Sequence, residues 1–126
     1  IGGVRIKQEH IRNLQTAKAA IATGIMYLLQ ESGVSTERVN KVYLAGGFGY
    51  FLQEEDAMRI GLLPKEFRGK VVSAGNTALA GAYTYGRLKD RKTVTDKLRQ
   101  TVQIRNLAQW EHFNEHFIQN MDFPNN

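Results

Sequence analysis

The residues with the clearest capacity for chemistry are the glycines that end an apolar run. The segment reads Val42-Tyr43-Leu44-Ala45-Gly46-Gly47-Phe48-Gly49. A β-favouring run of this kind is typical of a buried strand. Glycine takes positive φ without strain and has no Cβ, so a ligand can approach bare backbone amides. Taken alone, the pattern fits a ligand site over Gly46–Gly49 and a tight strand-to-helix turn equally well.

A second segment repeats the first. Lys70-Val71-Val72-Ser73-Ala74-Gly75 is again an apolar run that ends in Ala-Gly before a helix, for which Asn76 is a good N-cap. Two strands joined by a helix are expected to be parallel, with a right-handed crossover. Both glycine turns then lie at the same edge of the sheet, where ligands of open α/β sheets bind. Asn76 is interpreted first as the helix cap and second as a ligand contact.

Lys18 falls inside the apolar stripe of a predicted helix. Apolar residues recur around it at three- and four-residue spacing, at Ile11, Leu14, Ile21 and Ile25. A lysine in such a stripe either extends its amino group to solvent or meets a partner. If this helix runs beside the Gly46–Gly47 turn, Lys18 and Gln15 are candidates to contact a nucleotide.

The sequence offers no convincing catalytic or metal-binding set. The chain has no cysteine, which excludes a thiolate zinc site and a thiolate-held iron–sulfur cluster within these residues. His112 and His116 are four residues apart, but they are expected to point away from the apolar face of their helix. The carboxylates of Glu54, Glu55 and Asp56 suit a helix N-terminus. We therefore expect no catalytic residue and no metal ligand in this chain.

The helix and strand signals predict an α/β fold. Helices are expected over residues 8–31, 53–60, 77–88, 92–100 and 109–120, and strands over 41–45 and 70–74, with a short edge strand at 102–104. They predict a small, mainly parallel sheet with helices on both faces and a C-terminal helical extension.

Composition is typical of a globular domain and argues against a membrane-spanning protein. Of 126 residues, 42% are hydrophobic and 23% charged, as in ordinary globular domains. No run approaches the ~20 apolar residues of a membrane span, so no membrane partner is expected. The absence of cysteine fits a reducing compartment, and we expect a cytoplasmic protein.

The net charge of +5 is concentrated in residues 87–105. This segment holds seven basic and two acidic residues, a difference that equals the excess of the whole chain. Such a run binds an acidic protein or a nucleic acid, or is a solvated helix surface, which is the commonest case. No aromatic residue interleaves it for base stacking, so we expect no nucleic acid partner.

Four blocks of the sequence resemble, in order, the C-terminal end of the corrinoid-protein reductive activases. They are Ile11–Ile21, Val42–Gly49, Ile60–Pro64 and Gly75–Ala82, and the tail with Phe123-Pro124 is also similar. These activases are ATPases of the actin, sugar kinase and heat-shock chaperone superfamily with an N-terminal [2Fe–2S] ferredoxin domain. The resemblance covers nearly the whole chain and is weakest over 84–108. Lys7-Gln8-Glu9-His10 departs from the expected Thr cap and Asp.

The resemblance implies a fold and a site. Residues 1–90 would be the C-terminal part of an actin-like (ribonuclease H-like) ATPase subdomain, and residues 91–126 a helical extension packed on the same domain. Leu44–Gly49 matches the adenosine motif, and the helix with Gln15 and Lys18 matches the one that flanks the adenine. The nucleotide-binding residues expected are Gly46, Gly47, Phe48, Gly49, Lys18, Gln15 and Asn76.

The resemblance also implies an activity. In the full-length family, ATP hydrolysis drives an electron from the iron–sulfur cluster to a cobalt(II) corrinoid protein and restores cobalt(I). The phosphate-binding hairpins, the Mg²⁺-organising aspartates and the cluster cysteines have no match in these residues. The chain is therefore expected to bind the adenosine side of ATP, with Mg²⁺ and the [2Fe–2S] cluster held by missing parts, and to be inactive alone.

Two further expectations concern association. Strands that would pair beside residues 41–45 are missing, and an open edge favours pairing with another chain, so we expect a homodimer. The alternative function is a non-catalytic interaction or dimerisation module that uses the basic 87–105 segment and the aromatic tail.

Overall fold

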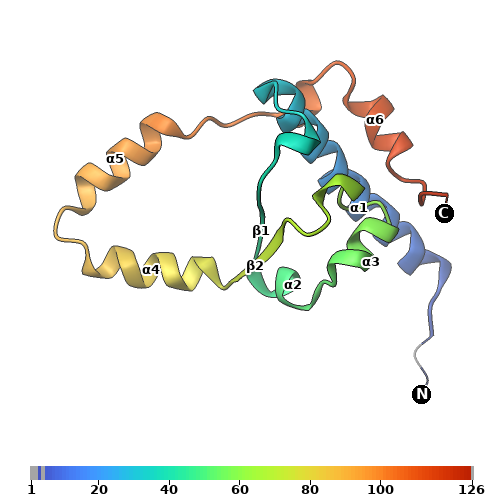
Figure 1. Cartoon of the computed structure of the whole chain (residues 1–126), viewed down its shortest axis with the longest axis horizontal. Helices are drawn as coiled ribbons and strands as arrows, with labels where there is room; N and C mark the ends of the chain where they lie inside the picture. Colours follow the sequence, from blue (N-terminus) through green and yellow to red (C-terminus); the bar gives the residue numbers. More distant parts are fainter. Residues whose placement is uncertain (1–2, 4, 126) are drawn as a thin grey trace.

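The computed structural model describes residues 3 and 5–125, apart from the side chains of Phe48 and Tyr50. The chain order of its elements is shown in Figure 1. The helices are α1 (Gln8–Ser32), α2 (Gly46–Phe51), α3 (Glu54–Arg59), α4 (Thr77–Arg87), α5 (Arg91–Thr101) and α6 (Phe113–Gln119), and the strands are β1 (Val42–Ala45) and β2 (Val71–Gly75). Short 3₁₀ turns cover Thr36–Arg38, Lys65–Phe67 and Leu107–Gln109.

The two strands form a small parallel sheet, which confirms the predicted strand direction and fold class. Val42 pairs with Val71 and Ala45 with Gly75, with an irregularity in register between Leu44 and Ala45. Each strand therefore reaches its glycine turn at the same edge of the sheet.

The core lies against one face of this sheet. Its buried residues come from α3 and the segment that follows it, and they are Ala57, Met58, Leu62, Leu63 and Phe67. Val42 and Leu44 of β1 pack against this cluster, whereas Tyr43 points to the other face and is 63% exposed. This alternation is that of a strand with one buried face. Residues between the two strands thus supply the packing that fixes the sheet.

Helix α1 buries a narrower face than the sequence suggested. Its buried residues are mostly small, and they are Lys18, Ala19, Ala22, Thr23 and Tyr27. Larger residues of the predicted stripe are not buried: Leu14 is 41% exposed and Ile21 is 43% exposed. Small side chains let a neighbouring segment approach the helix axis closely, and α6 lies along this side of α1 (Figure 1).

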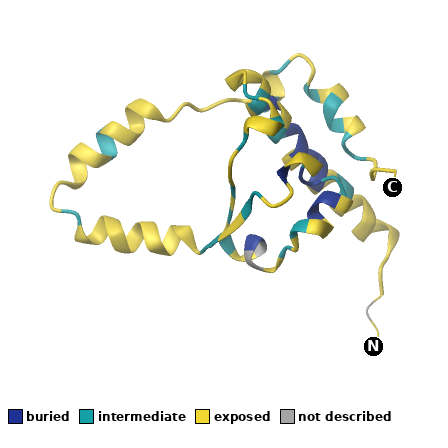
Figure 2. Cartoon of the chain, viewed as in Figure 1, coloured by how far each residue is buried: buried dark blue, intermediate teal, exposed yellow. Residues whose placement is uncertain are grey.

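Helices α4 and α5 form an arm that extends away from the core (Figures 1 and 2). Asn76 caps α4 by accepting a hydrogen bond from the Leu79 amide at 3.0 Å, which confirms its predicted capping role. Asp90 caps α5 in the same way through the Thr93 amide. Neither helix contains a buried residue. The two helices of the arm are therefore stabilised by their N-caps and backbone hydrogen bonds rather than by packing in a core.

The C-terminal region departs from two predictions. No strand forms at Val102–Ile104, where Ile104 is 92% exposed, because β-branched residues form a strand only beside a partner. The expected helix over 109–120 is shorter and begins at Phe113, after a 3₁₀ turn. No helix in the described ranges is long and apolar enough to cross a membrane.

Candidate functional site

The two glycine turns enclose a hollow at the carboxyl ends of β1 and β2. Its volume is about 230 Å³, and its walls are Gly46, Gly47, Phe51, Gly75 and Asn76. The predicted convergence of the two turns is thus confirmed. Phe51 and Gly75 are the two lining residues that the sequence prediction left out. Gly75 could have been included as the end of the second Ala-Gly strand, and Phe51 as the residue one helical turn after Gly47.

The three glycines of the first turn differ in whether their backbone conformation or their packing requires glycine. Gly46 has a φ of 84°, in the left-handed region that strains other residues. A Cβ on Gly49 would lie 2.9 Å from the Leu44 Cβ, so close packing of α2 on β1 explains that glycine. Gly47 has no positive φ, and a Cβ there would meet nothing within 4 Å. Of the three glycines in this turn, Gly47 is therefore the one that the fold of the described residues does not require.

Gly75 and Asn76 form the opposite wall of the hollow. Gly75 has a φ of 63°, and a Cβ on it would project into open space. The Asn76 side-chain oxygen is used by the cap of α4, while its side-chain nitrogen has no hydrogen bond within the described part of the chain. The hollow thus combines bare backbone with one side-chain N–H donor.

The structure does not bring Lys18 to this hollow. Its amino group donates to the main-chain oxygens of Asn120 and Asp122, each at 2.5 Å, and lies 5.3 Å from the centre of the Phe123 ring. The lysine inside the apolar stripe has met a partner, but that partner is the C-terminal segment. Burial lowers the pKa of the Lys18 amino group, and the nearby Asp122 carboxylate partly offsets this effect.

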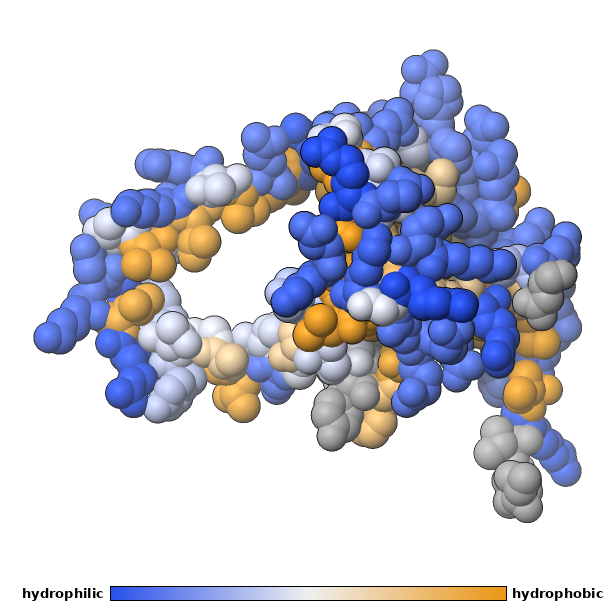
Figure 3. All heavy atoms as spheres, in the orientation of Figure 1, coloured by the Kyte–Doolittle hydropathy of each residue, from blue (hydrophilic) through white to orange (hydrophobic). Residues whose placement is uncertain are grey.

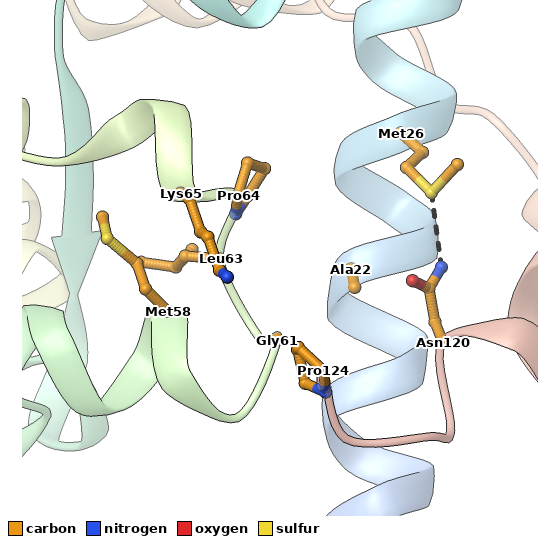
Figure 4. A pocket seen from close by; sticks show the side chains of 9 residues that line it. All are labelled: Ala22, Met26, Met58, Gly61, Leu63, Pro64, Lys65, Asn120 and Pro124. Carbon is orange, nitrogen blue, oxygen red and sulfur yellow. Dashed lines mark hydrogen bonds between the residues drawn. The ribbon is translucent and has the colours of Figure 1, made fainter. Parts of the chain in front are cut away.

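The C-terminal segment is fastened at several further points. The Asn120 side-chain amide donates to the Thr23 hydroxyl at 3.1 Å, and Pro124 packs over Gly61. Figure 4 shows the cavity beside this junction, about 220 Å³ in volume, between α1, the turn at Gly61 and the tail. Lys18 is therefore a structural residue of the junction between α1 and the tail.

The other expected site residues are placed as follows. Gln15 is half-buried on α1, one turn before Lys18, and is not among the residues that line the hollow. The Phe48 side chain lies outside the described residues. Of the seven residues expected from the sequence, Gly46, Gly47 and Asn76 line the hollow.

His116 packs against Trp110, contrary to the expectation that both histidines point away from the apolar face of their helix. Its ring stacks on Trp110 at 5.0 Å with an interplanar angle of 15°, and its Nδ1 is buried without a hydrogen-bond partner in the described structure. Trp110 also packs against Tyr27 of α1. The aromatic residues of the tail therefore hold α6 on α1, and His116 belongs to that packing.

Comparison with known proteins identifies the type of domain. A family model described as the C-terminal domain of RACo, the ASKHA domain, matches residues 2–126. The chain belongs to this RACo C-terminal domain family. The matched residues include both glycine turns, the arm formed by α4 and α5, and the C-terminal tail with α6.

Two curated relatives of this chain agree with that assignment. The corrinoid activation enzyme RamQ of Eubacterium limosum is 33% identical over 96% of this chain and 20% of its own length. The [Co(II) methylated amine-specific corrinoid protein] reductase of Methanosarcina barkeri is 35% identical over 62% of this chain and 14% of its own length.

A solved structure shares the fold of this chain. The reductive activator for corrinoid, iron-sulfur protein superposes with a TM-score of 0.83 at 30% identity, over 94% of this chain and 19% of that protein. The chain thus spans about a fifth of the length of the relatives that it matches along most of its sequence.

Proposed function

We propose that this chain supplies the adenosine side of the nucleotide site of an ATP-dependent reductive activator of corrinoid proteins. The observation that carries the proposal is Gly47: neither its backbone conformation nor its packing requires glycine, yet it lines the hollow between the two turns. A bare backbone at that point leaves room for a flat ring system. The position of the hollow, outside the carboxyl ends of parallel strands, is where such folds bind nucleotides.

The residues of the hollow suit adenosine better than phosphate. The walls are glycine backbone, the exposed Phe51 and the Asn76 amide, with no charged side chain among them. Phosphoryl transfer needs cationic groups or metal ions to stabilise the developing charge. In this proposal the chain binds and orients adenine and ribose, and the phosphates extend toward other parts of the activator.

In this proposal, Mg²⁺ and the iron–sulfur cluster are held by other parts of the activator. The sequence has no cysteine that could ligate a [2Fe–2S] cluster. When present, the cluster supplies the electron that reduces the cobalt(II) corrinoid protein, and ATP hydrolysis drives the transfer. The chain alone is then inactive, and the activator works in the cytoplasm, where ATP is available.

The test is a Gly47→Val substitution in the intact activator. The valine side chain would enter the hollow without straining a positive φ, so we expect the ATP affinity, measured by isothermal titration calorimetry, to fall at least tenfold. Gly81→Val is the matched control, because Gly81 lies on the arm and a Cβ there also meets nothing within 4 Å. Equal ATP affinity of Gly47→Val and the parent protein would contradict the proposal.

A further inference from the structure

Helix α5 carries an apolar ridge on the side that borders the opening between the arm and the core. Figure 3 shows hydrophobic atoms gathered on this side, while the outer side of α5 is hydrophilic. The α5 ridge consists of Val94, Leu98, Val102 and Ile104. Val94 and Leu98 are four residues apart on one face of α5, and Val102 and Ile104 follow the end of the helix and border the same hollow as Leu98. Leu98 is 58% exposed and Val102 is 63% exposed, so the ridge is not part of the core.

The ridge borders a hollow that could receive a side chain. This hollow has a volume of about 290 Å³ and is lined by Thr95, Leu98, Arg99, Val102 and Ile104. Its walls are mainly aliphatic, and Arg99 supplies the only charged side chain among these lining residues. Exposed apolar surface of this kind, with polar groups at its rim, marks interaction sites.

The basic residues around the ridge are available for an external partner. Lys92, Lys97 and Arg99 form no ion pair within the part of the chain that the structure describes. Arg91 differs, because its guanidinium donates to the main-chain oxygens of Gly86 and Leu88 and stacks over Tyr85. Arg91 thus braces the junction of α4 and α5, whereas the other three leave positive charge at the surface.

We propose that the α5 ridge docks an acidic polypeptide segment of another protein. An aliphatic or aromatic side chain of the segment fills the hollow beside Leu98, and carboxylates on either side of it pair with Arg99 and Lys97. The charge of residues 87–105 favours an acidic partner, since this segment carries the whole net excess of +5. The docking surface is separate from the nucleotide hollow and does not depend on the proposed nucleotide.

Two other occupants fit the ridge less well. A nucleic acid would meet aliphatic walls, and residues 87–105 include no aromatic side chain for base stacking. A second copy of α5 would bring two segments of the same positive charge together, which costs free energy.

Accessibility of the ridge in the intact protein is the first test. These 126 residues contain no cysteine, so Leu98→Cys adds the only thiol of this segment, and its modification is read by mass spectrometry from the peptide that carries position 98. We expect a maleimide reagent to modify this thiol in the native protein as fast as it modifies a Leu28→Cys control, since Leu28 on α1 is 61% exposed and Leu98 is 58% exposed. Protection of the thiol at position 98 would mean that another part of the protein covers the ridge, and would overturn the proposal.

The second test identifies the chemistry of the occupant. A library of random 12-residue peptides displayed on phage is selected against the intact protein. We expect the enriched peptides to combine a bulky apolar residue with flanking Asp or Glu, and to bind at least tenfold more weakly to Leu98→Ser and to Arg99→Glu. Leu28→Ser and Arg12→Glu, at exposed positions of α1, are the matched controls and should bind as the parent does.

Three further results would overturn the proposal. The first is a selection without peptides whose binding depends on Leu98. The second is steeply salt-dependent binding of a 20-base DNA that Arg99→Glu abolishes, which would assign the surface to nucleic acid. The third is self-association of the intact protein that Leu98→Ser abolishes, which would assign it to a second copy.

Discussion

At the scale of single residues, Lys18 and Gly47 were both predicted to contact a nucleotide, and the structure places them differently. Gly47 lines the hollow, whereas Lys18 binds the C-terminal segment. A lysine in an apolar stripe either extends its amino group to solvent or meets a partner, and Lys18 has a partner in the C-terminal segment. The sequence could not indicate which partner, because Asn120 and Asp122 lie more than a hundred residues further along the chain. Gly47 was predicted from its place after a strand, and the hollow around it supports that interpretation.

Replacement of Lys18 is expected to loosen the tail. Lys18→Met keeps the side-chain volume but removes the donor to two main-chain oxygens, so we expect the free energy of unfolding to fall by about 1–3 kcal/mol. Urea denaturation followed by tryptophan fluorescence measures this directly, because Trp110 lies in the tail. Lys7→Met, at an exposed lysine of the same chain, should change stability by less than about 0.5 kcal/mol. Equal stability of the two variants would show that the contact is not stabilising.

The lowered pKa of Lys18 gives this contact a pH dependence. Because burial lowers the folded-state pKa below its ordinary value, the unfolded state binds more protons than the folded state between the two values. Stability should therefore rise with pH across that interval, relative to Lys18→Met, which lacks the group. The measurement is the difference in unfolding free energy between parent and variant from pH 8 to pH 11. A difference that falls as pH rises would contradict the assigned direction.

At the scale of elements, the sequence predicted the helices, strands and caps that depend on residues near to one another in the chain. The extent of α1, its end at Gly33 in the left-handed conformation, the cap at Asn76 and the strands β1 and β2 all follow from nearby residues. The predicted strand at 102–104 failed because a strand depends on a neighbour that the described structure does not provide. The inward turn of His116 also depends on a long-range contact, the packing of Trp110 on Tyr27.

The packing of α2 on β1 makes a further prediction. A Cβ at position 49 would lie 2.9 Å from the Leu44 Cβ and 3.0 Å from the Leu44 carbonyl carbon, so Gly49→Ala should reduce the free energy of unfolding by about 1–3 kcal/mol. Gly81→Ala, in the exposed middle of α4, should instead increase it by up to about 1 kcal/mol. Thermal unfolding of both variants checks the difference in sign. A neutral Gly49→Ala would mean that α2 can move away from the strand without cost.

At the scale of the whole molecule, one edge of β1 has no neighbouring strand within the described chain. Within the described chain β1 pairs only with β2, and an isolated pair of strands is marginal in water unless another layer covers it. The Val42 amide donates to the Lys70 main-chain oxygen, on the side of β2. Successive residues of a strand direct their amides to opposite sides, so the Tyr43 amide points to the free edge. We expect the 126-residue chain to form a homodimer through this edge.

A Tyr43→Pro substitution tests that association. Proline removes the free-edge donor while the bond from Val42 to Lys70 remains, so the dimer should dissociate in sedimentation velocity runs. Tyr43→Val keeps the donor and should still dimerise. A parent chain that sediments as a monomer at high concentration would contradict the expectation.

The proposed function depends on adenosine binding in the hollow between the two glycine turns. A crystal structure of the intact activator with ADP tests it most directly. We expect electron density for adenine and ribose against Gly46, Gly47, Gly75 and Asn76, with the phosphates leading away from this chain and Lys18 still bound to the tail. Adenosine density elsewhere, with the hollow filled only by solvent, would show that the hollow is not the adenosine site.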